Sequence, residues 1–357
     1  MKKLLKLHFA FALIAILFAS CSDDDPTPTY PSIKGDFVIS QGNFMKNNGA
    51  ISLFGAEVID KDIFKSVNSR ILGDVVQDFE VVDTLGFIVV NNSQKVELVR
   101  MRDFKSVEAI DDQKLTYPRY VTQATENTVY ISNGSKEGEV IIYDFKKFEI
   151  VGTIPVGKGP EMMVKIGNKM FVANSGGFDK DKTVSVIDIA QRKVVKTITV
   201  DESPVTLKAD RNNNVWVYCK GEVEYVANGP GWEDDEYNYN NTKLFRIDAN
   251  TIDIEKEYLL PGKLGSFGSN LFAISNTDDV YFITDGVYKM TSGAAVVPAV
   301  KWDATAYFGI EVNPVNGNVY GLNSITNEVV ILNPSDASVI NKYTETVAMP
   351  HSVYFNY

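Results

Sequence analysis

Val129–Gly134, with the sequence VYISNG, is one of seven similar phrases that recur roughly every 40 residues along the chain. Each phrase is a run of β-branched or aromatic residues, which favour strands, closed by a small or polar residue that favours a turn. The other six are Phe37–Gly42 (FVISQG), Phe87–Asn92 (FIVVNN), Met170–Ser175 (MFVANS), Val215–Lys220 (VWVYCK), Val280–Asp285 (VYFITD) and Val319–Ser324 (VYGLNS). This period predicts an all-β chain folded as a seven-bladed β-propeller, and it disfavours a β-sandwich of many short strands.

Further strand-like segments surround each phrase and complete the predicted blades. A strand often led by proline lies upstream, as in Pro118–Val121, and two strands with alternating apolar residues lie downstream, as in Val184–Asp188 and Val194–Ile198. Four strands per unit is typical of a propeller blade. The first phrase lacks an upstream strand, whereas Pro350–Phe355 resembles an inner strand with no blade after it. We therefore expect the N- and C-terminal strands to close the last blade, within one propeller domain over residues 33–357.

The residues before the propeller have the pattern of an export signal followed by a tether. Lysines among the first six residues precede an apolar stretch over 4–18, and Ala19-Ser20-Cys21 follows, which resembles a bacterial lipobox. The acidic and then Pro/Thr-rich stretch after it is typical of an extended, disordered segment. We predict a lipoprotein signal peptide over 1–20, lipid attachment at Cys21 and a tether over 21–32. A plain signal peptide cleaved near Ala19 is the alternative.

Charge and cysteine content exclude several classes of function. The formal net charge is −11, and it becomes more negative once a lysine-containing signal segment is removed. Such a surface repels nucleic acid and anionic lipid headgroups, so we expect no nucleic-acid partner and contact with a membrane only through the lipid. Besides Cys21 the chain has only Cys219, so no disulfide is expected, and Cys219 is predicted to be a core residue.

Polar residues occur where the inner strands of the blades are predicted to begin. In an up-and-down blade this end lies on the same face as the end of the second strand, so these side chains converge on the mouth of the central channel. A ring of hydrogen-bonding groups at one mouth predicts a small-molecule site, formed by Gln77, Asp78, Arg119, Glu161 and His351, with Asn91 and Asn174 from the second strands. The alternatives are that the ring residues pair with each other and with channel water, and that the two asparagines serve turns.

Loops predicted on the same face add aromatic side chains. Tyrosine and tryptophan offer large, rigid contact area with one polar end, which suits ligand binding. The longest predicted loop, over 220–243, also carries consecutive acids, but these lack the alternating spacing of a calcium loop, so no metal site is predicted. The further candidate binding residues from these loops are Asn43, Phe44, Tyr117, Tyr120, Trp232, Tyr237, Tyr307 and Phe308.

The chain has little recognisable catalytic sequence. His8 belongs to the predicted signal peptide, and His351 alone cannot form a multi-histidine zinc or iron site. No nucleophile elbow or phosphate-binding glycine loop occurs. We therefore predict that the protein is not an enzyme and holds no cofactor. Hydrolysis by a carboxylate pair, Glu161 and Asp78, is the catalytic alternative.

Several segments carry a family resemblance. Val184–Val200 (VSVIDIAQRKVVKTITV) resembles the repeat of bacterial YVTN-type seven-bladed propellers. A second set of segments resembles a family of Bacteroidetes surface lipoprotein propellers, which includes cobalamin-binding members of TonB-dependent vitamin B12 uptake. These segments are Gln41–Phe44, Leu72–Gln77, Phe87–Ser93, Pro118–Tyr120 and Phe308–Tyr320.

This resemblance implies a location, a ligand and a partner. The acidic run after Cys21 resembles the surface-export signal of such lipoproteins, which places the chain on the outer membrane facing the exterior. The implied ligand is cobalamin or a related corrinoid, with Gln77, Asn43 and Asn91 meeting its amide arms and Arg119 its phosphate. The implied partner is an outer-membrane TonB-dependent transporter. A surface propeller for another small molecule or glycan, and an interaction scaffold without a small ligand, are the alternatives.

Overall fold

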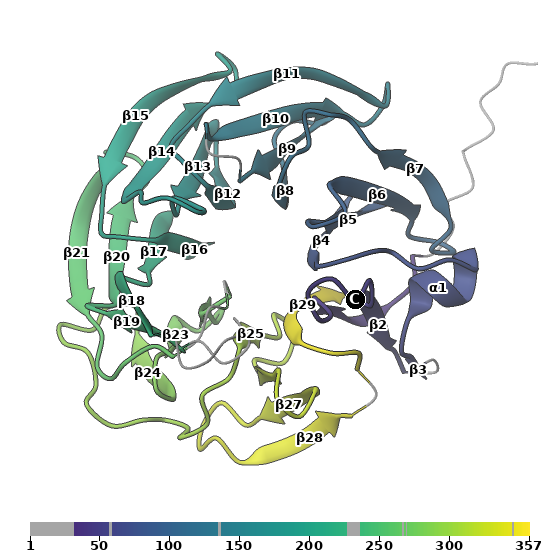
Figure 1. Cartoon of the computed structure of the whole chain (residues 1–357). Coiled ribbons are helices and arrows are strands. Elements are labelled where there is room, and N and C mark those ends of the chain that lie inside the picture. The colour runs from purple at the N-terminus through teal and green to yellow at the C-terminus, as the bar shows by residue number, and fades with distance from the viewer. Residues whose placement is uncertain are drawn as a thin grey trace, which may run out of the picture. The chain divides into compact units, whose positions relative to one another are not determined.

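The computed structural model describes residues 32–56, 59–134, 137–226, 236–265, 268, 270–344 and 346–357. The predicted signal peptide, Cys21 and nearly all of the predicted tether lie outside these residues. Ser32–Tyr357 form one compact unit, in which seven sheets are arranged around a central channel (Figure 1). The predicted all-β, seven-bladed propeller is therefore confirmed. In the part of the chain that the structure describes, no helix is long and apolar enough to span a membrane.

Each blade is an antiparallel sheet whose first strand lies nearest the channel. From the channel outward, blade 1 consists of β29 (Pro350–Asn356), β1 (Gly35–Ser40), β2 (Ala50–Phe54) and β3 (Ile59–Asp60), and blade 2 consists of β4 (Val76–Val82), β5 (Leu85–Val90), β6 (Lys95–Arg100) and β7 (Ser106–Ile110). Blade 3 consists of β8 (Pro118–Gln123), β9 (Thr128–Asn133), β10 (Glu139–Asp144) and β11 (Glu149–Pro155). Blade 4 consists of β12 (Pro160–Ile166), β13 (Lys169–Asn174), β14 (Thr183–Asp188) and β15 (Lys193–Thr199). A short helix, α1 (Ile63–Asn68), follows β3.

Blades 5 to 7 follow the same order with two departures from the expected pattern. Blade 5 consists of β16 (Pro204–Ala209), β17 (Asn214–Cys219), β20 (Lys243–Asp248) and β21 (Asp253–Leu259). Blade 6 contains β22 (Phe272–Ile274), β23 (Asp279–Ile283) and β24 (Val287–Thr291). Blade 7 consists of β25 (Gly309–Val312), β26 (Val319–Asn323), β27 (Glu328–Leu332) and β28 (Val339–Tyr343). Blade 6 has three strands among the described residues, and only an isolated bridge from Val287 to Asp303 occupies the outer position. The predicted loop over 220–243 contains a separate hairpin, β18 (Glu222–Val226) and β19 (Glu236–Asn240).

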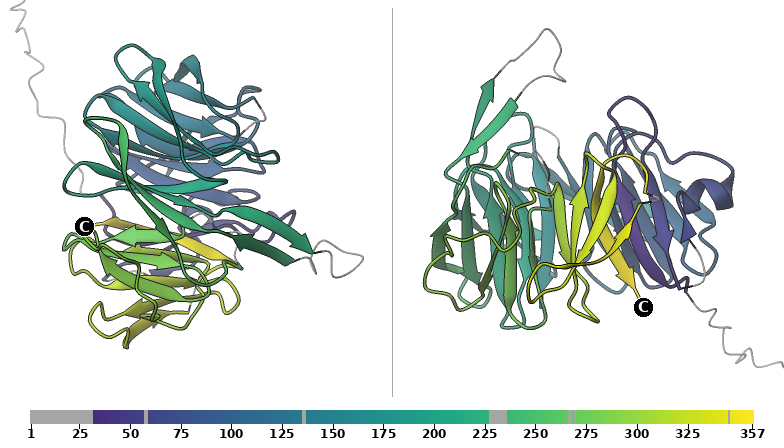
Figure 2. Two further views of the ribbon diagram at one scale, coloured as in Figure 1. Left: turned by 90° about the vertical axis from the view of Figure 1, so that its left-hand side faces the viewer. Right: turned by 90° about the horizontal axis from the view of Figure 1, so that it is seen from below.

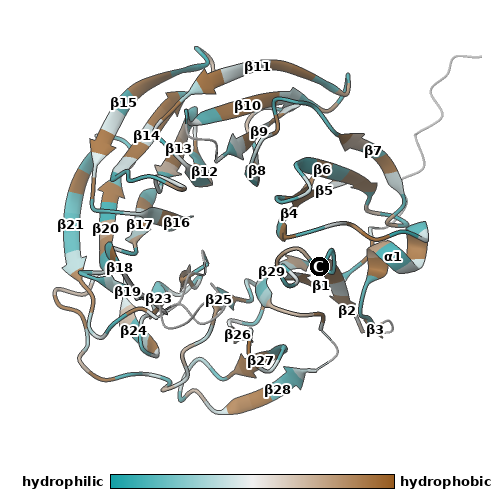
Figure 3. Cartoon of the chain, in the orientation of Figure 1, coloured by the Kyte–Doolittle hydropathy of each residue, from teal (hydrophilic) through white to brown (hydrophobic). Residues whose placement is uncertain are grey.

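Burial explains why the sequence alternates as it does. Second strands such as β9 are buried along their whole length, whereas outermost strands such as β15 and β21 are mostly exposed. Polar and apolar residues are accordingly mixed along β15, as Figure 3 shows. Neighbouring blades pack through apolar side chains, for example where Phe37 of blade 1 meets Phe79 of blade 2 with ring centroids 5.3 Å apart. Cys219 is fully buried, as expected of a core residue.

The two chain ends close blade 1, as predicted. β29 pairs antiparallel with β1, from Gly35 opposite Asn356 to Ser40 opposite Pro350. The buried Asp36 carboxylate accepts hydrogen bonds from the hydroxyl groups of Tyr320, at 2.8 Å, Tyr343, at 2.6 Å, and Tyr357. This carboxylate joins blade 7, blade 1 and the C-terminus, so the ring is closed by polar contacts as well as by the sheet.

All inner strands run in the same direction along the channel, which defines two faces of the propeller. We call the face where inner strands begin the loop face, because the hairpin β18–β19 projects from it, and the opposite face the tail face, because the C-terminus lies there (Figure 2). The first described residues also lie at the tail face, since the Asn356 side chain donates hydrogen bonds to Ser32 Oγ at 2.9 Å and Ile33 O at 2.6 Å.

Candidate functional site

Irregular starts of the inner strands aim polar side chains at the channel mouth. The register shifts between Val76 and Asp78 in β4, and equivalent shifts follow Pro118, Pro160 and Pro204 in the next three blades. Such bulges bend a strand and redirect the side chain of the extra residue. Proline fits the first strand position because no ladder hydrogen bond from its nitrogen is needed there. Gln77, Arg119 and Glu161 are the residues that these bulges present.

These three side chains form one hydrogen-bonded chain across blades 2, 3 and 4. Arg119 Nη1 donates to Gln77 Oε1 at 2.8 Å, and Arg119 Nε and Nη2 both lie 2.9 Å from Glu161 Oε2. Gln77 Nε2 donates to the Tyr120 hydroxyl at 3.0 Å, and Ser175 Oγ donates to Glu161 Oε1 at 3.3 Å. The ion pair is mostly buried, so removing either partner would leave a charge with little solvation, a change that costs about 3–5 kcal/mol.

A second cation lies close to this network. Lys220, at the end of β17 in blade 5, is buried, and its Nζ lies 5.2 Å from the centre of the Tyr239 ring in the hairpin. Burial lowers the pKa of Lys220 to about 8, while Glu161 raises it and Arg119 lowers it further. The mouth therefore carries two cationic groups and one carboxylate, on a protein whose overall charge is strongly negative.

Exposed aromatic rings surround this mouth. Phe178 is 92 % exposed and packs edge-on against Tyr117, with ring centroids 5.6 Å apart. Phe44, in the loop after β1, is 45 % exposed, and Asn43 beside it is also exposed. Arg119 lies near Tyr117: a Cβ placed on Gly134 would lie 3.1 Å from Arg119 Cγ and 3.4 Å from the Tyr117 carbonyl oxygen. The loop face thus combines apolar contact area with a charged centre.

Four of the other predicted binding residues, Asn91, Asn174, Tyr307 and Phe308, lie in the interior. Asn91 donates to Pro118 O at 3.0 Å, and Asn174 donates to the Thr183 and Ser185 hydroxyls at 3.0 Å each. The buried Tyr307 ring covers Gly321, where a Cβ would lie 2.5 Å from the ring, and Phe308 is buried beside it. Trp232 lies outside the described residues, and for Tyr237 the structure describes only the backbone, in β19. The roles of these residues in ligand binding stay predictions.

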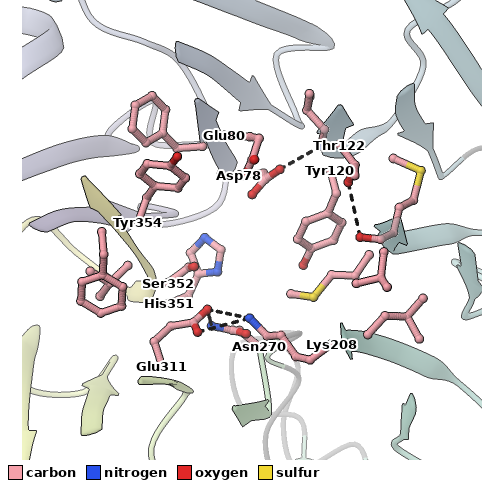
Figure 4. A pocket seen from close by; sticks show the side chains of 18 of the residues that line it. Asp78, Glu80, Tyr120, Thr122, Lys208, Asn270, Glu311, His351, Ser352 and Tyr354 are labelled. Carbon is pink, nitrogen blue, oxygen red and sulfur yellow. Dashed lines mark hydrogen bonds and ion pairs between the residues drawn. The ribbon is translucent and has the colours of Figure 1, made fainter. Parts of the chain in front are cut away.

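Below the mouth network the channel contains a cavity of about 370 Å³. Most of its lining comes from the middle and the last part of the inner strands, such as Glu80 in β4 and Phe355 in β29, although Asn270 and His351 lie near strand starts, so most of the cavity lies toward the tail face. Figure 4 shows the side chains that line it. Tyr120, Asp78 and His351 line it, whereas Gln77, Arg119 and Glu161 do not. The structure therefore divides the single predicted site into a mouth and a channel cavity.

Carboxylates dominate the charged lining of the cavity. Asp78 accepts a hydrogen bond from Val121 N at 2.8 Å, and burial raises its pKa to about 7. Burial, together with the nearby Asp78, raises the pKa of Glu80 to about 8. Both groups retain some contact with the channel space but are surrounded by protein, which explains why water stabilises their charges poorly. The two carboxyl groups together therefore hold a proton at neutral pH.

On the other side of the cavity, an ion pair and a hydrogen bond join side chains of blades 5, 6 and 7. Lys208 Nζ lies 3.0 Å from Glu311 Oε1, and Asn270 Nδ2 donates to the same oxygen at 2.7 Å. His351 is 2 % exposed, and burial lowers its pKa to about 3, so the ring is neutral. Its carbonyl oxygen would lie 2.3 Å from a Cβ at position 309, so only glycine fits there on β25. Within the described residues, no three histidine, cysteine, aspartate or glutamate side chains are arranged to hold a metal ion.

Sequence reasoning missed several of these residues. Glu80, Lys208 and Glu311 are polar residues well inside inner strands, where apolar core residues are expected, and that pattern could have indicated the cavity. Phe178 and Lys220 carry no comparable signal, because their places depend on how loops from different blades meet.

Comparison with known proteins supports the fold and leaves the family open. No family model matches the chain, and no curated protein matches its sequence. Among solved structures, hydrazine synthase of Kuenenia stuttgartiensis is similar with a TM-score of 0.62 and 13% identity, covering 87% of this chain and 99% of that one. A quinonprotein alcohol dehydrogenase-like protein from Bacteroides thetaiotaomicron is similar with a TM-score of 0.65 and 14% identity, covering 91% of this chain and 78% of that one.

These similarities require one correction. The prediction that the chain is not an enzyme is wrong, because it excluded catalysis on this fold. The solved propellers similar to the chain include an enzyme and a protein described as dehydrogenase-like. The lack of a familiar catalytic motif does not exclude catalysis on this fold, since propellers place functional side chains from separate blades around one channel. At 13% and 14% identity the comparisons show the fold alone.

Proposed function

We propose that the loop face of this propeller binds a small molecule carrying both an anionic group and large apolar surfaces. The observation that carries the proposal is the combination of Arg119 and Lys220 at the mouth with the exposed Phe178 and Phe44 rings. Glu161 balances the charge of Arg119, so Lys220 leaves the mouth with a net positive charge. Arginine also suits phosphate because its planar donors match the phosphate oxygens. The aromatic rings supply contact area for the apolar part of the ligand.

Cobalamin and related corrinoids are the ligand class to which we assign this site. A corrinoid offers broad apolar ring faces, amide arms and a phosphate, and each of these groups has a counterpart at the loop face. The sequence resemblance to the Bacteroidetes surface lipoprotein propellers supports the same ligand. In this proposal the bound corrinoid passes to an outer-membrane TonB-dependent transporter. The proposal concerns binding, and it does not require that the ligand remains chemically unchanged.

The corrinoid proposal predicts a specific loss of affinity in Phe178→Ala. Because Phe178 is almost fully exposed, the substitution leaves the fold intact but removes a ring that would pack on the ligand. We expect affinity for cyanocobalamin, measured by isothermal titration calorimetry, to fall about five- to tenfold, or roughly 1 kcal/mol. The matched control is Val315→Ala, which truncates a 72 % exposed side chain on the tail face. No binding by the unmodified protein at micromolar cyanocobalamin would remove the corrinoid proposal.

We also propose that Cys21 carries a lipid and anchors the chain to the outer membrane with the propeller outside the cell. In support, the first described residues lie at the tail face, opposite the proposed binding face. In a Bacteroidetes host, Cys21→Ser is expected to abolish incorporation of radiolabelled fatty acid and to release the protein from the membrane fraction. Protease added to intact cells should digest the unmodified protein. Protection from that protease would contradict the surface location, and unchanged labelling would contradict the attachment site.

A further inference from the structure

The channel cavity differs from the mouth in the chemistry that it offers. It lies below the Gln77–Arg119–Glu161 network and is lined by none of these three residues. Its charged side chains are the carboxylates of Asp78, Glu80 and Glu311 and the ammonium group of Lys208, and this ammonium group is already paired with Glu311. The Glu80 carboxyl group makes no hydrogen bond or ion pair with the residues that the structure describes. The cavity therefore has negative charge without a matching cation.

Buried acceptors aimed into the cavity give a second, independent indication of a ligand. Asn270 is 1 % exposed and lines the cavity, and its Oδ1 has no hydrogen-bond partner among the described residues. The two ring nitrogens of His351 also lack a partner of ordinary hydrogen-bond geometry there, although the backbone of Val76 lies close. Figure 4 shows the His351 ring between the Asp78 carboxylate and the Asn270–Glu311–Lys208 group. A buried polar atom without a partner is unfavourable, and a donor from a ligand would satisfy it.

Apart from Thr122 and Ser352, the remaining wall of the cavity is apolar. β12 contributes Met162, Met163 and Val164, and β16 contributes Leu207. Methionine adapts its shape to a bound group more readily than branched side chains do. A cavity of about 370 Å³ lies at the small end of ligand sites. The matching ligand is small, has several N–H donors at one end and has a short apolar body.

We propose that this cavity is a binding site for a small organic ammonium compound, held by the Asp78 and Glu80 carboxylates and the Asn270 carbonyl oxygen, with its apolar part against Met162 and Met163. A metal ion fits less well, because the described residues provide no cluster of three suitable ligands. An anion is disfavoured because Lys208 is already neutralised by Glu311. This site is independent of the proposed corrinoid site at the loop face.

Binding of the ammonium ion is coupled to proton release. The titratable groups facing the ligand are Asp78 and Glu80 from β4, Tyr120 from β8, Lys208 from β16, Glu311 from β25, and His351 and Tyr354 from β29, whereas β12 contributes none. The ammonium ion favours ionised carboxylates, so it displaces the proton that Asp78 and Glu80 hold near neutrality. Affinity therefore rises between pH 6 and pH 8.5, which lies below the pH at which a simple amine loses its own charge.

The test compares matched compounds on the full mature chain by calorimetry at pH 8.5. The ammonium compounds are 2-phenylethylamine, butylamine and 1,5-diaminopentane, and 2-phenylethanol is the uncharged counterpart of the first. We expect at least one amine to bind, and 2-phenylethanol to bind at least tenfold more weakly than 2-phenylethylamine. Glu80→Gln should weaken the amine at least tenfold, whereas Glu108→Gln, on the exposed face of β7, should leave it unchanged.

Several outcomes would overturn the proposal. These are no binding by any of the three amines at millimolar concentration, equal affinity for amine and alcohol, and an unchanged amine affinity in a folded Glu80→Gln variant. Displacement of the amine by Ca²⁺ or Mg²⁺ would indicate a metal site instead. Because Phe178→Ala alters only the loop face, loss of corrinoid binding in that variant with intact amine binding would separate the two sites.

Discussion

Removing Pro350–Asn356 together with Tyr357 is expected to abolish cooperative folding of the whole propeller. β29 is the inner strand of blade 1 and pairs with β1 along the full length of β1. Without it, the hydrogen-bonding edge of β1 is exposed, and the Asp36 carboxylate loses the hydroxyl group of Tyr357. His351 and Val353 also leave the core. A typical domain has only about 5–15 kcal/mol of net stability, and the loss of an inner strand exceeds what it can absorb.

The measurement is thermal unfolding followed by circular dichroism, with a dye that binds exposed apolar surface as a second signal. The truncated chain should show no sharp transition and should bind the dye at 25 °C. The matched control replaces 223–238 with a short Gly/Ser linker, because the hairpin β18–β19 forms its own two-stranded sheet. This control keeps Tyr239, which packs in the core and pairs with Leu264. A truncated chain that unfolds as sharply as the full chain would show that the ring does not depend on its terminal closure.

The period and the terminal strands were sufficient to predict the ring. Every inner-strand start places its side chains near one axis once the blades are closed, so Gln77, Arg119 and Glu161 could be grouped from sequence although they lie in three blades. That they bond to each other depends on bulges between positions such as Val76 and Asp78, and the sequence has no signal for the direction in which a bulge turns a side chain.

Other features depended on contacts that no local pattern encodes. The sequence predicts that Tyr307 is an aromatic binding residue of the loop face, but its ring fills the space beside Gly321 of β26. Among the described residues, the outer position of blade 6 holds only the isolated bridge between Val287 and Asp303, and the segment after β24 contains Pro298, which has no N–H for a ladder. The tyrosines around Asp36 come from distant parts of the chain, so only the closed ring brings them together.

Glu80→Gln is expected to stabilise the protein at alkaline pH and to have little effect in acid. Below about pH 4 the carboxyl group is protonated in both the folded and the unfolded chain, so its ionisation costs nothing. Above its ordinary pKa of 4.5 the unfolded chain ionises while the folded chain keeps the proton, because burial raises the folded pKa to about 8. The free energy of unfolding therefore falls as pH rises across this window and levels off once the folded form ionises too.

Each unit of pKa difference corresponds to about 1.4 kcal/mol, but contact of Glu80 with the channel space reduces the effect, so we expect about 2 kcal/mol of stabilisation above pH 8. Urea unfolding of both proteins at pH 4, 6, 7.5 and 9 measures this difference. Glu108→Gln is the control, because an exposed carboxylate on β7 should give equal stability to wild type at every pH. A Glu80→Gln difference that stays constant from pH 4 to 9 would mean that Glu80 ionises normally in the channel, and the proton-coupled binding of an ammonium ion there would lose its physical basis.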